Sequence, residues 1–171
     1  MTRLPGARGR GRESFPQGFR RRVRAAELRR PSAGERVTLP FFVYGTLRPG
    51  EVNHALFLRG RTLREEPGRL PGAVLYEGPG YPYAVEEPGG VVDGELVTAL
   101  PEAYPGLLAE LDRLEEYVPG DPRSLYERVA REVVRTADGR AVRAWVYVAA
   151  PAVAARLRAR GTPIRSGNWR G

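Results

Sequence analysis

Short apolar runs along the chain alternate with glycine- and proline-rich turns, and this pattern predicts a mixed α+β domain. Two segments of alternating apolar residues flank Asp138-Gly139, which predicts a β-hairpin. The predicted strands cover residues 39–43, 73–76, 83–85, 91–100, 125–136 and 141–149, and the predicted helices cover residues 53–58, 105–118 and 151–160. We therefore expect a small, strongly curved sheet with helices packed outside it.

The predicted helix over residues 105–118 carries one carboxylate inside its apolar stripe. At about 100° per residue, Leu107, Leu108, Leu111, Leu114 and Val118 share one face. With Leu108 at 0°, Glu115 lies at about 340°, whereas Asp112 at about 40° and Glu116 at about 80° lie at the edge of the stripe or outside it.

A carboxylate in such a position is costly unless it is paired, protonated or lining a cavity. Desolvation raises its pKa toward the range where it exchanges protons near neutrality. Helix geometry leaves two readings of Glu115 open: a proton-transfer role, or a structural role with a packed stem or a buried ion pair.

The segment Tyr44-Gly45-Thr46-Leu47 follows the first predicted strand and predicts a loop that can hold an anion. Gly45 permits a sharp turn and a close approach by another molecule, and a turn at a strand end can present several N–H groups together. Asn53 is expected to cap the next helix, whose N-terminus would add positive potential. An ordinary turn between a strand and a helix fits the same residues.

The composition excludes several kinds of chemistry. The chain has no cysteine and a single histidine, His54, so it has no disulfide, thiolate metal site, cysteine nucleophile or multi-histidine metal site. No apolar run reaches 18 residues, and hydrophobic residues make up 42% of the chain. We therefore expect a soluble, cytoplasmic protein with no membrane segment.

The net charge of +8 is carried entirely by the first forty residues, which contain eleven arginines and three glutamates. Residues 41–171 contain equal numbers of basic and acidic residues. We therefore expect a basic, disordered extension over residues 1–38 and a folded domain over residues 39–171. The extension could also result from an upstream start codon, and nucleic acid is expected to bind only through it, if at all.

Two motifs together resemble the gamma-glutamylcyclotransferase-like family: the loop Tyr44-Gly45-Thr46-Leu47 and the segment Leu111-Asp112-x-x-Glu115. The family often has glycine after the glutamate, where this chain has Glu116, and the register of the motif favours Glu115. The resemblance extends over about residues 41–169. Further matches in family order are Gly50, Asn53-His54, Tyr81-Pro82, Gly94-Glu95-Leu96, Tyr126-Glu127-Arg128, Tyr147 and Ser166-Gly167-Asn168-Trp169.

The resemblance implies a compact mixed β-barrel with helices outside and a pocket at one end. It implies that the α-amine of a γ-glutamyl compound attacks its own γ-carbonyl, giving 5-oxoproline and a free amine, without a cofactor or a metal. Glu115 would be catalytic, and the substrate-binding residues would be Tyr44, Gly45, Thr46, Leu47, Tyr126 and Arg128.

Some of these expectations have alternatives. Tyr126 and Arg128 stand at alternate strand positions and so share a face, but Arg128 could equally pair with a surface carboxylate. Tyr147 is expected in the core with a partner for its hydroxyl, and Trp169 is expected to clamp the tail onto the domain. We expect a monomer that takes a small-molecule substrate. The alternative is a non-catalytic small-molecule or protein-binding module of the same fold.

Overall fold

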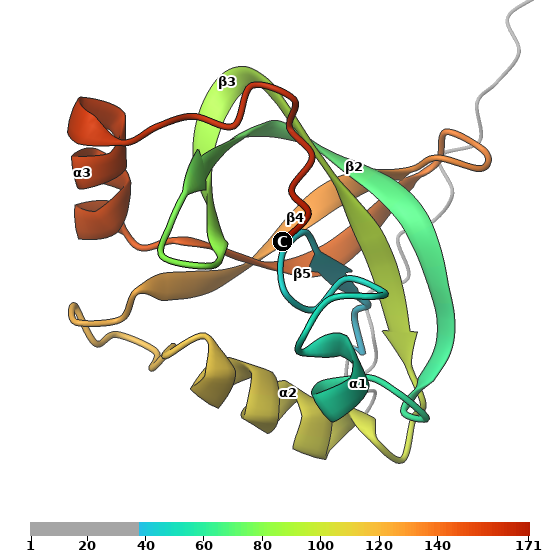
Figure 1. Cartoon of the computed structure of the whole chain (residues 1–171). Helices are drawn as coiled ribbons and strands as arrows, with labels where there is room; N and C mark the ends of the chain where they lie inside the picture. Colours follow the sequence, from blue (N-terminus) through green and yellow to red (C-terminus); the bar gives the residue numbers. More distant parts are fainter. Residues whose placement is uncertain (1–37) are drawn as a thin grey trace, which may run out of the picture. The chain divides into compact units, whose positions relative to one another are not determined.

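A closed β-barrel forms the framework of the computed structural model, which describes residues 38–171 (Figure 1). The order of the strands around the barrel is β1-β3-β2-β4-β5. Neighbouring strands are antiparallel except where Phe41 of β1 meets Trp145 of β5 in parallel and completes the circle. The elements are β1 (Phe41–Val43), α1 (His54–Phe57), β2 (Thr62–Glu77), β3 (Pro82–Ala99), α2 (Tyr104–Leu114), β4 (Tyr126–Arg135), β5 (Ala141–Ala149) and α3 (Pro151–Arg160).

This architecture confirms the predicted α+β barrel with helices outside. The hairpin of β4 and β5 and the helix α3 lie close to their predicted positions. The predicted basic extension, its possible contact with nucleic acid and its possible origin in an upstream start codon all concern residues outside the described range.

The long hairpin of β2 and β3 differs from the prediction. The two strands pair from Thr62–Ala99 down to Glu77–Pro82. The pairing jumps from Pro71–Val91 to Ala73–Glu86, so Pro88-Gly89-Gly90 forms a bulge inside one strand rather than a turn between two. The first half of β2 was not predicted because its charged residues, prolines and glycines give no alternating apolar pattern.

Adjacent residues of the strands supply two separate cores. Phe42 packs with strand residues such as Leu75 and Val146 in the barrel interior. Phe41 points to the opposite face and packs against the helices, together with Leu107 and Leu111 of α2. The interior core therefore fills the barrel. Helices α2 and α3 lie outside it, as Figure 1 shows.

Helix α2 is shorter than predicted, and this changes one of its apolar positions. Leu107 and Leu111 are fully buried, and Leu108 and Leu114 are partly buried against the same core. Val118, predicted to share their face, is 57% exposed because the helix ends at Leu114 and the chain turns away. The predicted apolar face is therefore correct within the helix and wrong beyond its last residue.

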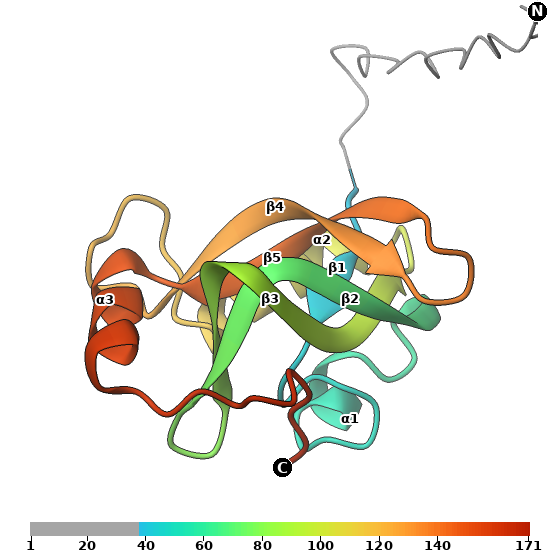
Figure 2. The ribbon, with the colours of Figure 1, turned by 90° about the horizontal axis from the view of Figure 1, so that it is seen from above.

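The tail after α3 crosses back over the barrel. The amide of Ile164 donates to the carbonyl of Leu75, and the amide of Asp93 donates to the carbonyl of Gly167. Ile164 and Trp169 pack against the interior core, which confirms Trp169 as a clamp. The tail passes toward α1 and the loop after β1 (Figure 2). Within residues 38–171, no helix is long and apolar enough to span a membrane.

Candidate active site

A pocket of about 250 Å³ opens where the loop after β1, the start of β3, the end of α2 and strands β4 and β5 meet. Six of the seven residues predicted for the site line it: Tyr44, Gly45, Thr46, Leu47, Glu115 and Tyr126. Arg128, the seventh, does not line this pocket. Segments separated by up to about a hundred residues therefore form one cavity, as the paired motifs predicted.

The end of helix α2 places Glu115 at the pocket. The amide of Glu116 donates to the carbonyl of Arg113, and the amide of Tyr117 donates to that of Asp112 at 2.8 Å. These two bonds form a Schellman motif, with Glu115 as the C-cap residue and Glu116 in the left-handed region at φ 51°. Glu115 thus lies at the turn that ends the helix, where its side chain reaches the cavity.

Glu115 is a partly buried residue, and its carboxyl group has no ionic or hydrogen-bonding partner within residues 38–171. Burial raises its pKa from 4.5 to about 7. Its negative charge adds to burial in raising the pKa of Tyr44, Tyr126 and Tyr147, which share the pocket. A carboxyl group with this pKa can take up and return a proton near neutral pH.

The loop after β1 is held by internal hydrogen bonds and presents several N–H groups without protein acceptors. The amide of Arg48 donates to the Gly45 carbonyl at 3.0 Å, and the amide of Asn53 donates to the Thr46 carbonyl at 2.9 Å. Among the described residues, the amides of Gly45, Thr46 and Leu47 have no acceptor, and all three residues line the pocket. This is the arrangement expected of a site for a carboxylate or an oxyanion.

Asn53 does not cap helix α1 through its side chain, contrary to the prediction. Its amide group instead donates to the Thr46 hydroxyl at 2.9 Å, because the loop brings that hydroxyl within reach. The helix spans only His54–Phe57, so the predicted end at Leu58 is one residue too far. Asn53 therefore supports the loop rather than the helix.

Arg48 holds the loop from behind, and sequence analysis did not single it out. Its guanidinium group is buried and donates to Glu95 through Nε at 2.7 Å and through Nη2 at 3.0 Å. Its Nη1 donates to Asn168 at 2.6 Å and to the Trp169 carbonyl at 2.8 Å. The motif matches at Glu95 and Asn168-Trp169 were the available signal, because each supplies an acceptor for this cation.

Two pocket tyrosines donate their hydroxyl protons to backbone carbonyls of other segments. The Tyr44 hydroxyl donates to the Tyr147 carbonyl at 2.5 Å, and the Tyr126 hydroxyl donates to the Pro82 carbonyl at 2.9 Å. Burial raises the pKa of both phenols, so both stay protonated. Their rings form walls of the pocket while their hydroxyl protons stay bound to backbone carbonyls.

Arg128 lies behind the pocket wall. Its guanidinium group stacks 4.7 Å from the centre of the Trp145 ring, and its Nε is 3.4 Å from Asp112 Oδ1. The same oxygen accepts a hydrogen bond from the Tyr147 hydroxyl at 2.7 Å, and Tyr147 lines the pocket. Of the two readings of Arg128, this geometry matches pairing with a carboxylate; its role toward substrate stays a prediction.

Comparison with known protein families agrees with this geometry. The profile of the family described as gamma-glutamyl cyclotransferase, AIG2-like, matches residues 41–171. The chain belongs to this family. The match covers every element that contributes to the pocket.

Individual relatives of this gamma-glutamyl cyclotransferase family member are moderately similar. The gamma-L-glutamyl-butirosin B gamma-glutamyl cyclotransferase of Niallia circulans is 36% identical over 115 residues, which cover 66% of this chain and 69% of that protein. An aig2-like protein from mouse is 27% identical, with a TM-score of 0.51 over 66% of this chain and 77% of that one. A protein from Arabidopsis thaliana is 26% identical, with a TM-score of 0.53 over 81% and 73% of the two chains.

Glu116 stands at the position where the family motif often has glycine. It is the only residue other than glycine with a positive φ among residues 38–171. Glycine adopts this conformation without steric cost, which accounts for its frequent use at this position. In this chain a glutamate adopts this conformation, and Glu115 lies at the cavity.

Proposed function

We propose that this protein converts a γ-glutamyl amide into 5-oxoproline and a free amine, with Glu115 as its acid–base group. The observation that carries the proposal is the meeting, in one pocket, of a carboxyl group with a pKa of about 7 and three free backbone amides. The carboxyl group can move a proton, and the backbone amides can stabilise negative charge.

The reaction needs no water and no external nucleophile. Glu115 removes a proton from the substrate α-ammonium group, and the freed amine attacks the γ-carbonyl carbon to form a C–N bond. Glu115 then returns this proton to the departing nitrogen as the original amide bond breaks. The ring nitrogen loses its second proton, which the released amine takes up to leave as an ammonium ion. Because both reacting groups belong to one molecule, holding them close together supplies much of the rate.

The loop from Gly45 to Leu47 is suited to the anionic part of this reaction. Its amides either bind the α-carboxylate of the glutamyl group or stabilise the oxyanion that forms as the amine attacks. Both tasks need donors that are already oriented, and the hydrogen bonds from Asn53 to Thr46 hold the loop in place. The walls of Tyr44 and Tyr126 would exclude water from the reacting atoms.

The proposed reaction and one relative support a class of substrate. The Niallia circulans relative is named for a γ-L-glutamyl group attached to butirosin B. We infer that this protein also acts on a γ-glutamyl group linked to an amine. We further propose that it works as a cytoplasmic monomer without a cofactor or metal.

The test is to incubate the purified protein with a panel of γ-glutamyl amides and to measure 5-oxoproline. Glu115→Gln keeps the shape of the side chain but cannot cycle a proton, so kcat is expected to fall by roughly a hundred- to ten-thousand-fold. Glu116→Gln is the matched control: Glu116 also lines the pocket but is exposed, and the variant should retain most of the activity.

Comparable turnover by Glu115→Gln and the parent would refute the catalytic role of Glu115. A parent protein that binds these amides but releases no 5-oxoproline would refute the proposed reaction and favour a binding module.

A further inference from the structure

A second hollow of about 340 Å³ lies next to the candidate active site. The turn between β2 and β3 forms one side of it through Glu77 and Tyr81, and the tail forms the other through Asn168, Trp169 and Arg170. Tyr81 also lines the first pocket, so the two hollows adjoin at this side chain. A group leaving the first pocket past Tyr81 would enter the second.

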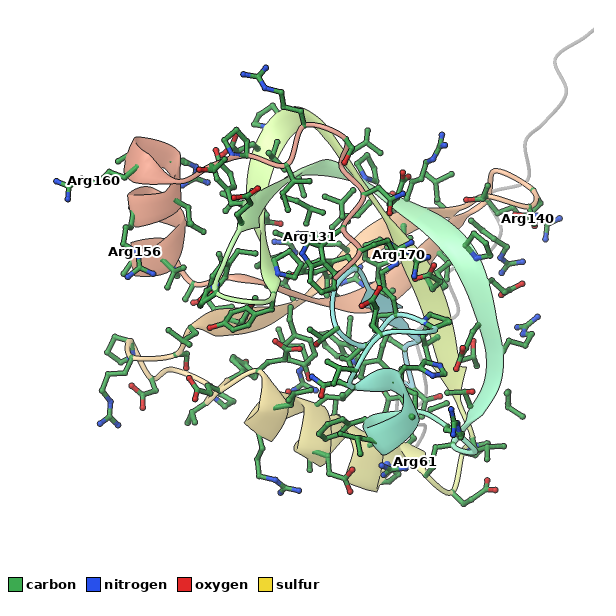
Figure 3. All side chains as sticks on the ribbon, viewed as in Figure 1. Arg61, Arg131, Arg140, Arg156, Arg160 and Arg170 are labelled. Carbon is green, nitrogen blue, oxygen red and sulfur yellow. The ribbon has the colours of Figure 1, made fainter. Side chains whose placement is uncertain are left out.

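The charges around the second hollow leave one carboxylate without a partner. Arg170 lies 3.8 Å from Glu51 and 3.5 Å from Glu95, so its positive charge is already shared by two carboxylates. Glu77 is exposed and forms no ion pair within residues 38–171. Figure 3 shows that Arg156 and Arg160 project from α3 into solvent, well away from Arg170.

The other residues that line the second hollow can contact the carbon chain of an organic amine. Tyr81 and Trp169 are both half-buried and contribute aromatic rings, which attract cations and pack against aliphatic chains. The side-chain oxygen of Asn168 is already bound to Arg48, which fixes this side chain in the lining. An aromatic surface beside one free carboxylate favours a ligand that is both extended and positively charged.

We propose that the second hollow binds the amine portion of the substrate, and that Glu77 selects amines carrying a further positive charge. This inference rests on the proposed function, because it places the γ-glutamyl group in the first pocket with the departing nitrogen toward Tyr81. The preferred substrates are then γ-glutamyl derivatives of diamines or polyamines. Amines that carry a carboxylate would be disfavoured by repulsion from Glu77.

Three amides of matched length separate these possibilities: the γ-glutamyl derivatives of 1,4-diaminobutane, butylamine and 4-aminobutyrate. Their distal groups are positive, neutral and negative. Binding is measured by calorimetry on the full chain carrying Glu115→Gln, and turnover is measured on the parent. We expect affinity and turnover to be highest for the diaminobutane derivative, lower for the butylamine derivative and lowest for the aminobutyrate derivative.

Glu77→Gln should reduce the preference for the diamine over the butylamide by roughly two- to fivefold, the range expected for an exposed charge pair. The change should appear in KM rather than kcat, and it should shrink at high salt. Glu102→Gln removes another exposed carboxylate that lies outside both hollows and should leave the preference unaltered.

An equal affinity for the three amides, or a preference that Glu77→Gln leaves intact, would overturn the proposal. A charge preference in binding without any 5-oxoproline from the parent would support the second hollow while refuting the proposed reaction.

Discussion

The Tyr147 hydroxyl donates a hydrogen bond of 2.7 Å to Asp112 and thereby ties strand β5 to the last turn of α2. The Asp112 carboxylate also lies close to the Arg128 guanidinium group. Its backbone carbonyl accepts a hydrogen bond from the amide of Tyr117, in the turn that places Glu115. One residue therefore connects the pocket wall, a largely buried cation and the backbone around the candidate acid–base group.

Asp112→Asn is expected to destabilise the fold by about 2 kcal/mol, because it leaves Arg128 largely buried without a counter-charge. Tyr147→Phe removes only one hydrogen bond and should cost about 1 kcal/mol. Urea unfolding measures both, and the two losses should not be additive in the double variant because they share one carboxylate. Asp121→Asn is the control: it disrupts an ion pair with the exposed Arg123 and should leave the free energy of unfolding unchanged. Additive losses would argue against a shared network.

The raised pKa of Glu115 predicts a pH dependence of stability. The folded protein holds this proton up to about pH 7, whereas the unfolded chain releases it near pH 4.5. Since the folded state binds more protons in this window, its stability falls as pH rises from 4.5 to 7. Glu115→Gln lacks this loss, so its advantage over the parent should grow to about 2–3 kcal/mol by pH 8.

Parallel urea titrations of Glu115→Gln, Glu116→Gln and the parent at pH 4 and pH 8 measure this difference. A stability difference between Glu115→Gln and the parent that is the same at both pH values would show that Glu115 titrates normally.

The left-handed backbone at Glu116 predicts a stabilising substitution. Glu116→Gly should raise the free energy of unfolding by about 1 kcal/mol, because glycine has no Cβ to clash at φ 51°. Glu116→Ala is the control: it removes the charge but keeps the Cβ, so it should gain little. Thermal unfolding compares the three chains. An equal gain from alanine would assign the effect to the charge rather than to the backbone.

The buried Arg48 predicts a link between the tail and the loop after β1. Arg48→Met should destabilise the protein by about 3 kcal/mol, because the buried Glu95 would lose its bidentate partner and keep only the half-exposed Arg170 at 3.5 Å. Arg48→Lys should recover only part of this loss, since an ammonium group cannot donate along both edges of a carboxylate. KM should rise in both variants as the loop loosens. Arg69→Met breaks an exposed pair with Asp93 and should alter stability by less than about 0.5 kcal/mol.

The parts of the fold that followed from the sequence are those in which the apolar pattern is local. Leu107 and Leu111 repeat at helical spacing, and the valines around Asp138-Gly139 alternate, so burial and hairpin pairing could be predicted. The first half of β2 has no such pattern. Its pairing with β3 depends on a partner strand and a bulge that no local signal specifies.

The residues of the candidate site also divide into those whose positions could be predicted from the sequence and those whose positions could not. The inward position of Glu115 followed from its angle on the helix, although the residue lies at the C-cap rather than within the helix. The contacts of Arg48 with Asn168 and Trp169 span more than a hundred residues, and nothing near Arg48 in sequence indicates them. Similarly, the placement of Arg128 behind the pocket depends on how Trp145 and Asp112 pack, which strand alternation alone does not specify.

The contact between Arg48 and the tail also bears on how the protein is made. During synthesis, the residues that surround Arg48 are translated early, while Asn168 and Trp169 follow 120 and 121 positions later. Domains generally fold as units during synthesis. The loop beside Arg48 therefore gains its contacts with the tail only after the last part of the domain has been translated.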